Sequence, residues 1–458
     1  MTVDHTVAAI STPYGRGGIA VIRISGRDAL AVTEKMFLPA SGKSIIEYKA
    51  GSAVYGKILF EGRQIDTGIA TVFRAPHSYT GEDTVEISCH GGILLTEKVL
   101  AAVLAAGATR AGPGEFTKRA FLAGKLSLSE AEAVISLIEA EGEEQLKLAS
   151  AEAKGVLGRE IERIHDALIR LVAATYVQID YPDEDLSGMN AETFLRDLDT
   201  VLRDVENLET SYRTGHAVAE GITTVILGKP NTGKSSLLNA LAGYDRAIVS
   251  SVAGTTRDTV EQKIRVGAVT LTLHDTAGVH DTSDTVEQMG VKRSLALLEK
   301  AELILLVLDG SEELDADDKA LIERLKTAPC PVICVCNKSD KESRLPSEAI
   351  ACFSQRAVIS AATGEGLDAL RTMIEGLFVA GKIDYDQTPI LTGAHRHAMI
   401  VKAKELLTRA RDAVRMGMTP DVAALDLEGA SAELGRLDGR EVGEEVVDSI
   451  FSRFCVGK

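Results

Sequence analysis

Cysteines and long apolar runs are both scarce in this 458-residue sequence, and each scarcity excludes a class of protein. Six cysteines do not indicate a disulfide framework in a chain of this length. Cys330, Cys334 and Cys336 lie in or beside one apolar run without convincing zinc spacing, so we expect them to pack in a core. The longest apolar runs, such as 303–308, are as long as strands, whereas a membrane helix needs about 20 apolar residues. Nothing resembles a signal peptide, so we expect a soluble cytoplasmic protein with no membrane association.

Basic residues are also in short supply. The sequence has 50 Lys and Arg against 67 Asp and Glu, which gives a formal net charge of −17. Affinity for nucleic acid depends largely on Lys and Arg side chains that neutralise phosphates, so we do not expect this chain to bind RNA tightly by itself. Residues 1–124 contain thirteen basic and eleven acidic side chains, so RNA contacts are expected there or through a basic partner. The more acidic helical part is either a docking face for such a partner or an ordinary solvated surface.

The stretch from Gly228 to Ser235 predicts a site for a nucleoside triphosphate. It follows the apolar run 223–227, typical of a buried strand, and precedes 236–241, typical of the first turns of a helix. Glycines let the loop turn tightly enough for its N–H groups to point at phosphate oxygens. Lys234 supplies a cation, and the Ser235 hydroxyl is a ligand for Mg²⁺.

Two further motifs complete the magnesium side of this site. Residues 275–278, Asp-Thr-Ala-Gly, follow a strand-like run, so Asp275 can hold Mg²⁺ through water and Gly278 can approach the terminal phosphate. The polar stretch 253–258 lies between apolar ones and resembles a switch loop. Its Thr256 is placed to give the second hydroxyl ligand to Mg²⁺.

Two motifs near residue 340 and residue 360 specify the base. Residues 337–340 follow the apolar run 332–336, and Asp340 can accept two hydrogen bonds from the N–H groups of guanine, which adenine does not offer. Ser360 and Ala361 complete the base pocket in the way that a Ras-like GTPase does. Five motifs in the correct order, each at a strand end, predict a GTPase.

The residue directly after the Asp-Thr-Ala-Gly motif departs from the Ras pattern. Ras-like proteins place a Gln there to orient the attacking water, helped by an arginine finger. Val279 can neither orient water nor stabilise charge. Either hydrolysis is negligible or these functions come from elsewhere, and the carboxylates of 280–287 are candidates, although most of them would be solvated loop charges.

The chain divides into three parts by its patterns. Residues 1–124 combine short strand-like runs with one helical stretch, which predicts a mixed α/β unit. Residues 125–220 turn helical, and Ser127 with Glu130 fits a capping box at the start of a helix. The α/β GTPase unit occupies 221–381, and 382–458 is helical again. The expected fold is therefore α/β plus α, with a Ras-like P-loop G domain inserted into an α-helical domain.

Several stretches together resemble the MnmE (TrmE) family of bacterial tRNA modification GTPases. The stretches that carry the resemblance are the P-loop with Asn231, 254–258, the opening 12–26, the middle segments 78–83 and 112–117, and the closing 454–458. Matches at the beginning, centre and end make a borrowed GTPase domain an unsatisfactory explanation. One departure is the pair His280 and Asp281, where the family often has Arg and Glu, which leaves details of switch ordering open.

The resemblance implies a potassium-dependent GTPase that acts as a homodimer. It also implies a partnership with the FAD-dependent protein MnmG (GidA), with which the chain would install an aminomethyl or carboxymethylaminomethyl group on the wobble uridine of tRNA. Potassium would replace the arginine finger, held by Asn231, Ser250, Val252 and Thr255, and Glu287 would order the attacking water. The residues expected to bind GTP are then Gly228, Asn231, Thr232, Gly233, Lys234, Ser235, Ser236, Ser250, Val252, Thr255, Thr256, Asp275, Thr276, Ala277, Gly278, Asn337, Lys338, Asp340, Ser360 and Ala361.

The resemblance also implies that residues 1–124 bind 5-formyltetrahydrofolate or a related tetrahydrofolate and form the dimer. The matching positions are Arg23, Glu86, Lys125 and Lys458, whose charges suit a carboxylate tail and a pterin-like ring. Cys455 lies in the closing Cys-Val-Gly-Lys and is expected to matter for the modification, as nucleophile, base or positioning group.

Two other functions compete with this one. A ribosome-assembly GTPase switch of the Era type would share the G domain, but it would usually append a basic RNA-binding domain, and none is visible in the sequence. A dimerising scaffold with slow turnover would be favoured if Val279 had no functional substitute.

Overall fold

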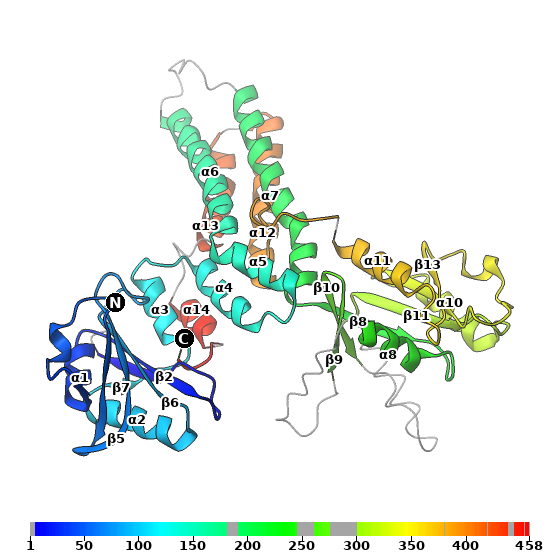
Figure 1. The fold of residues 1–458 in the computed structure, drawn as a ribbon. Helices are drawn as coiled ribbons and strands as arrows, with labels where there is room; N and C mark the ends of the chain where they lie inside the picture. The colour runs from blue at the N-terminus through cyan, green and yellow to red at the C-terminus, as the bar shows by residue number, and fades with distance from the viewer. Residues whose placement is uncertain are drawn as a thin grey trace, which may run out of the picture. The chain divides into compact units, whose positions relative to one another are not determined.

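The computed structural model describes residues 5–180, 191–244, 261–274, 300–379, 381–418, 420–437, 444–452 and 454–457. It divides into two compact units (Figure 1). Unit 1 consists of residues 1–135, 152–166 and 431–458, and unit 2 consists of 136–151 and 167–430. Within the described ranges, no helix is both long and apolar enough to cross a membrane.

Unit 1 is built on a seven-stranded sheet with the strand order β3-β4-β5-β6-β2-β1-β7. Only β7 runs parallel to its neighbour, β1, and the other pairs are antiparallel. The strands are β1 Val7–Ile10, β2 Ile19–Ser25, β3 Phe37–Pro39, β4 Ala53–Phe60, β5 Arg63–Phe73, β6 Thr84–His90 and β7 Thr109–Arg110. Its first helical elements are α1 Ala29–Met36, η1 Ile45–Glu47, α2 Ile93–Ala105 and α3 Glu115–Leu122.

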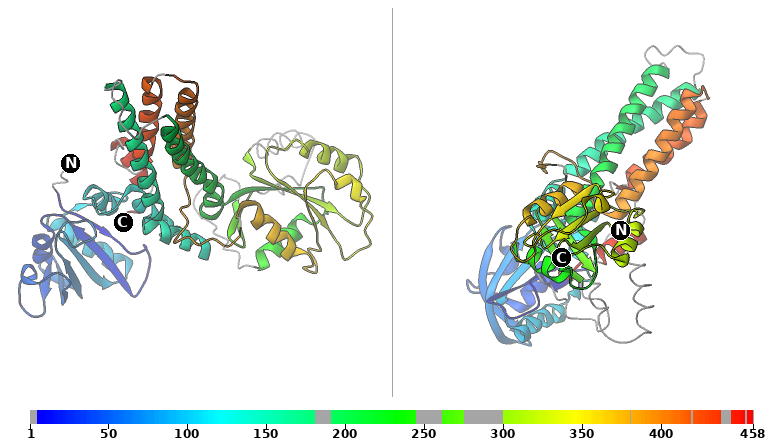
Figure 2. Two further views of the ribbon diagram at one scale, coloured as in Figure 1. Left: turned by 90° about the horizontal axis from the view of Figure 1, so that it is seen from above. Right: turned by 90° about the vertical axis from the view of Figure 1, so that its right-hand side faces the viewer.

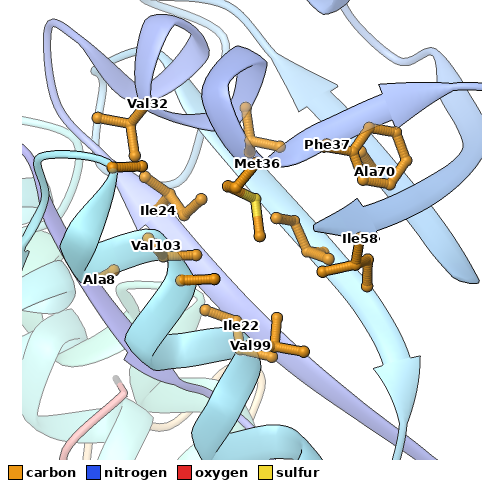
Figure 3. Packing of buried hydrophobic residues seen from close by; sticks show 14 of the residues in the cluster. Ala8, Ile22, Ile24, Val32, Met36, Phe37, Ile58, Ala70, Val99 and Val103 are labelled. Carbon is orange, nitrogen blue, oxygen red and sulfur yellow. The ribbon is translucent and has the colours of Figure 1, made fainter. Parts of the chain in front are cut away.

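The two faces of this sheet have different roles. On β2, Ile22 and Ile24 are fully buried and pack against α1 and α2 (Figure 3). Successive side chains of a strand alternate between its faces, so Arg23 between them points to the opposite face. On that opposite face, Val7 and Ala9 of β1 form a small cluster with Phe116 of α3. The period-2 pattern of β2 therefore puts the core on one side and a cation on the other.

The C-terminal segment belongs to unit 1. Helix α14, Glu444–Phe451, contributes Val447 and Phe451 to a cluster with Ala131 of α4, Leu128–Glu139. Ser127 and Glu130 form both hydrogen bonds of the predicted capping box at the start of α4, at 2.7 and 3.2 Å.

Unit 2 contains long helices and a second sheet. Helices α7, Ala191–Ala219, and α12, Ala394–Arg415, lie side by side (Figure 2) and are joined by ion pairs from Lys404 to Glu209 and from Arg415 to Asp199. The remaining helices of the bundle are α5 Glu143–Ala153, α6 Val156–Asp180 and α13 Pro420–Leu437, which extend across the boundary between the units.

The second sheet has the strand order β13-β12-β11-β8-β10-β9, and only β9 is antiparallel to its neighbour. The strands are β8 Ile222–Leu227, β9 Glu261–Val266, β10 Val269–His274, β11 Leu303–Asp309, β12 Val332–Asn337 and β13 Gln355–Val358. The helical elements around it are α8 Lys234–Tyr244, α10 Ala316–Leu325, η3 Ser347–Ile350 and α11 Leu367–Phe378. Cys334 and Cys336 are buried in its core, as expected for packing residues.

Candidate functional site

The predicted phosphate loop joins the end of β8 to the start of α8. Gly228 has a φ of +147°, and a Cβ there would lie 2.2 Å from the Val307 carbonyl oxygen. Gly233 has a φ of +95°, and a Cβ there would lie 2.1 Å from Asn337 Nδ2. Asn231, with φ of +63°, is one of the non-glycine residues in the left-handed region. Both glycines are therefore required by the conformation of this loop and by its neighbours.

Lys234 folds back over the loop that precedes it. Its ammonium group donates hydrogen bonds to the carbonyl oxygens of Gly228 and Lys229, each at 2.7 Å. Burial lowers the pKa of Lys234. Thr232 Oγ1 also donates to the Lys229 carbonyl, at 2.9 Å, so the loop is braced from within.

Asn337 joins the phosphate loop to the base motifs. Its Nδ2 donates to the Thr232 carbonyl at 2.9 Å, and its Oδ1 accepts from the Ala361 backbone N–H at 2.9 Å. The residue is 2% exposed. The sequence predicted Asn337 as a nucleotide contact, and the structure shows it as a buried brace between the first and last described motifs of the site.

Asp340 is held by the second base motif. Ser360 Oγ donates to its Oδ1 at 2.6 Å, and this hydrogen bond lowers the pKa of Asp340. Ser360 Oγ in turn accepts from the Thr363 N–H at 3.2 Å. The carboxylate is thus ionised, oriented and on the surface, in the form that accepts from two N–H donors.

Sequence reasoning missed two ion-pair groups that support this site. Asp309, at the end of β11, pairs with Lys338, whose φ is +68°. Burial opposes ionisation of Asp309, but hydrogen bonds from Lys338 and Ser311 outweigh it and lower the pKa. Asp309 directly follows an apolar run, and this is the same signal that located the residues after β12.

The second group surrounds Lys229 in the phosphate loop. Its ammonium contacts Asp315 at 2.5 Å and the buried Asp318 at 2.7 Å. Both carboxylates raise the pKa of Lys229. They also form a capping box at the start of α10, a local signal that was available in the sequence.

Ten predicted site residues lie outside the described residues. They are Ser250, Val252, Thr255, Thr256, Asp275, Thr276, Ala277, Gly278, Glu287 and Lys458. Val279 lies outside them as well. The magnesium, potassium and water-ordering roles given to these positions stay predictions.

In unit 1, Arg23 and Glu86 face each other across β2 and β6. They are register partners, and Glu86 Oε1 lies 2.8 Å from both Nε and Nη2 of Arg23. The guanidinium also lies over two aromatic rings, 5.3 Å from the centroid of Tyr79 and 5.4 Å from that of Phe116. Arg23 is therefore a half-buried, oriented cation rather than a solvated strand residue.

Lys125 approaches the same side of unit 1 through the loop after β5. Its ammonium donates to the carbonyl oxygen of Pro76 at 2.9 Å and to that of Ser78. Tyr79, which contacts Arg23, is the next residue of this loop. The loop thus connects three of the four predicted folate positions, and Lys458 lies outside the described residues.

The closing segment of the chain lies against β1 and the loop before α3. The Gly457 carbonyl accepts from Ser11 Oγ at 3.0 Å, and Val456 forms a bridge with Pro113. Gly457 has φ of +102°, and a Cβ there would lie 2.1 Å from the Ile10 carbonyl oxygen. Cys455 is exposed beside these contacts.

Arg119 is the buried cation of an ion-pair group that was not predicted from the sequence. The residue is 3% exposed, and its guanidinium contacts Glu82 at 3.1 Å, Glu115 at 2.7 Å and the His5 carbonyl at 3.1 Å. Glu82 also accepts from Ser25 Oγ at 2.8 Å. The two middle segments of the sequence, 78–83 and 112–117, each contribute one of these carboxylates, which gives them a structural role in joining the sheet to α3.

Comparison with known proteins relates both parts of the chain to one group. Residues 6–125 match the family model described as GTP-binding protein TrmE N-terminus, and residues 128–455 match the MnmE helical domain. The chain is 38% identical over 461 residues to the tRNA modification GTPase MnmE of Clostridioides difficile, covering 100% of both chains. It is 40% identical over 462 residues to that of Lactobacillus delbrueckii subsp. bulgaricus, covering 100% of this chain and 99% of the relative.

Solved structures match a smaller share of the chain. Era from Aquifex aeolicus bound to GDP.AlF4- is 27% identical with a TM-score of 0.28, covering 40% of this chain and 66% of that chain. The G domain of the T. maritima FeoB iron transporter is 25% identical with a TM-score of 0.26, covering 34% and 97%.

Proposed function

The chain belongs to the MnmE (TrmE) family. From that membership we propose which of its sites act in GTP hydrolysis and which act in tRNA modification. The resemblance predicted from the sequence is confirmed, and so is the prediction of a GTPase that acts in tRNA modification. We propose that the chain hydrolyses GTP with the help of potassium. We further propose that it modifies the wobble uridine of tRNA together with the FAD-dependent partner MnmG.

The observation that carries the GTPase proposal is the bracing of the phosphate loop to the base motifs by Asn337. Because Asn337 ties Thr232 to Ala361, the group that recognises guanine and the groups that bind phosphate are set at a fixed spacing before GTP arrives. Binding then costs little reorganisation of the loop. Asp340 would accept from the guanine ring, and Lys234 would leave its two carbonyl partners to pair with the phosphates.

Metal ions would supply the positive charge that hydrolysis needs. Ser235 and Thr256 would hold Mg²⁺, which offsets charge on the phosphates. Asn231, Ser250, Val252 and Thr255 would hold K⁺ in place of an arginine finger, and Glu287 would orient the attacking water. Asn231 adopts the left-handed conformation, in which asparagine is enriched among the non-glycine residues.

Unit 1 would bind 5-formyltetrahydrofolate or a related tetrahydrofolate in a homodimer. Arg23 and Lys125 provide cations for the glutamate tail, Glu86 accepts from ring N–H groups, and the Tyr79 and Phe116 rings offer flat surfaces beside Arg23. The folate would supply the one-carbon unit. Lys458 would join this site, and Cys455 would act on the group being transferred or position it.

GTP turnover in potassium and in sodium buffers of equal ionic strength tests this proposal. We expect strong stimulation by potassium and a loss of turnover of at least 100-fold in Glu287→Ala, because water would no longer be oriented. Glu313→Ala removes an exposed carboxylate of the same domain and should change nothing. Turnover that ignores the cation, or that survives Glu287→Ala, would contradict the mechanism and favour the Era-type switch.

The modification step needs its own assay with the flavoprotein and tRNA. Cys455→Ser should abolish modification of the wobble uridine while leaving potassium-stimulated GTP turnover intact. Equal loss of both activities would instead mean that Cys455 supports the structure of the protein.

A further inference from the structure

A small cavity of about 300 Å³ in unit 1 is separate from the positions discussed so far. Ile10, Ile19 and Ile93 give it an apolar floor, and residues 12–17 form its wall. Arg23, Glu86 and Lys125 do not line it. Its volume is at the lower end of the range for ligand sites, which is enough for a group of the size of one nucleotide.

The loop 12–18 is fixed at both ends. Thr12 Oγ1 accepts from the Val21 N–H at 3.3 Å, and Gly17 donates to the Gly91 carbonyl at 3.0 Å. The Gly91 N–H donates back to Gly18 at 3.4 Å. The wall of the cavity is therefore formed before any ligand binds, which lowers the cost of ordering it.

Two glycines of this loop have no explanation within the protein. Neither Gly15 nor Gly18 has a positive φ, and a Cβ added to either would meet nothing within 4 Å. Neither conformation nor packing requires glycine there. The missing side chains leave the backbone at these two positions open to close approach by another molecule.

Tyr14 and Arg16 present two recognition groups from the same loop. Tyr14 is 69% exposed, and its hydroxyl donates to Glu97 at 2.7 Å, which anchors the edge of the ring and leaves a face open. Arg16 is exposed and has no hydrogen bond or ion pair within the described part of the chain. An anchored aromatic face beside an uncommitted guanidinium matches one unstacked nucleotide, whose base stacks on the ring while its phosphate pairs with the cation.

We propose that this cavity binds a single unpaired pyrimidine nucleotide of the RNA substrate. The proposal rests on the proposed function, because the wobble uridine lies in a single-stranded loop and enzymes that act on a base take it out of the stack. Ser11, which directly follows Ile10 of the cavity floor, donates to the Gly457 carbonyl at 3.0 Å, so the segment that carries Cys455 lies beside one end of the cavity lining. The near-neutral charge of residues 1–124, within a chain of net charge −17, agrees with RNA contacts in this unit.

Photocrosslinking of the full-length protein tests where the nucleotide binds. The probe is an anticodon stem-loop RNA with 4-thiouridine at the wobble position, in excess over protein, and the crosslinked peptide is identified by mass spectrometry. We expect the crosslink within residues 12–18. Tyr14→Ala should lower the yield at least ten-fold, and Tyr14→Phe should retain it because the ring face remains. Tyr55→Ala removes another exposed tyrosine of the same unit and serves as the control.

Arg16→Ala should weaken RNA binding about five-fold to ten-fold for every loop sequence and reduce the salt dependence by about one phosphate contact. Arg63→Ala, at an exposed position on β5, should leave both unchanged. Crosslinks outside residues 12–18, or yields indifferent to Tyr14→Ala, would overturn the proposal. Protection of this loop by the flavoprotein but not by RNA would overturn it in favour of a protein-docking surface. Because the readout is the crosslinked position, it stays informative if the modification or potassium assays fail.

Discussion

At the scale of single residues, the choice of guanine depends on how Asp340 is held. Ser360 donates to one carboxylate oxygen at 2.6 Å and lowers the pKa of Asp340, so the side chain stays ionised and acceptor-only at neutral pH. Guanine offers two N–H donors to such a group. A hydrogen bond to a charged group contributes about 1.5–3 kcal/mol, so two of them account for a large selectivity.

Asp340→Asn should therefore weaken GTP binding by roughly 100-fold, because the amide places a donor against a donor. Xanthosine triphosphate should recover much of the loss, since its ring carries a carbonyl where guanine carries the amino group. Titration with fluorescent forms of both nucleotides measures the two affinities. Asp317→Asn, an exposed carboxylate on α10, is the matched control, and equal weakening for both nucleotides in Asp340→Asn would contradict this account.

Asn337 supports the site through the two hydrogen bonds of its side-chain amide. Asn337→Ala would leave the buried Thr232 carbonyl and the partly buried Ala361 N–H without their partner. We expect the free energy of unfolding to fall by about 2–4 kcal/mol for the part of the protein that GTP stabilises. GTP should also bind more weakly. Chemical denaturation with and without GTP measures both, and Asn207→Ala on an exposed face of α7 should be silent.

At the scale of elements, the end of α7 is tied to the start of the second sheet by an ion-pair group. His216 Nε2 lies 2.7 Å from Glu302, which also accepts from the Thr223 N–H on β8. Glu220 lies 3.2 Å from Nδ1 without the alignment of a hydrogen bond, so the contact to Glu302 is the better formed of the two. The carboxylates of Glu220 and Glu302 raise the pKa of His216 to about 10.

The ion-pair group around His216 makes the free energy of unfolding depend on pH. The folded pKa of His216 lies above its usual value near 6.5, so the stabilisation is complete below about pH 6.5 and is lost as pH rises towards 10. His216→Gln should remove this dependence and lower stability by roughly 1–3 kcal/mol at pH 6. Thermal unfolding of both proteins between pH 6 and pH 9.5 measures the difference, which should shrink as pH rises. A difference that stays constant or grows would contradict the assignment.

The boundaries of these elements were largely predictable because their signals are local. The apolar runs 303–308 and 332–336 became β11 and β12, and the stretch 382–458 that was predicted to be helical contains α12, α13 and α14. The contacts that Asn337 makes with Thr232, or Arg119 with Glu82, were not predictable. Each of these contacts joins residues far apart in the sequence. One partner is often a backbone carbonyl, which every residue has, so the residue type does not indicate which carbonyl accepts.

At the scale of the whole molecule, the two ends of the chain meet in one unit. Unit 1 takes its strands from the beginning of the sequence and its last helix from the end, and residues 167–430 of unit 2 lie between these stretches. Such a connection fixes both ends of the intervening chain on unit 1. The exposed thiol of Cys455 is then held by backbone contacts on either side of it rather than by its own side chain.

Gly457 is the residue on which this docking of the tail depends most directly. Its φ of +102° disfavours any side chain, and a Cβ would lie 2.1 Å from the Ile10 carbonyl oxygen, closer than atoms can approach. Gly457→Ala should displace the tail and lower wobble-uridine modification at least ten-fold while GTP turnover stays within two-fold, because the phosphate loop and base motifs are untouched. Gly62→Ala has a similar strain, with φ of +73°, but meets nothing within 4 Å and should keep both activities. If Gly457→Ala modified tRNA normally, the position of the tail would not control the reaction, and Cys455 would need another explanation.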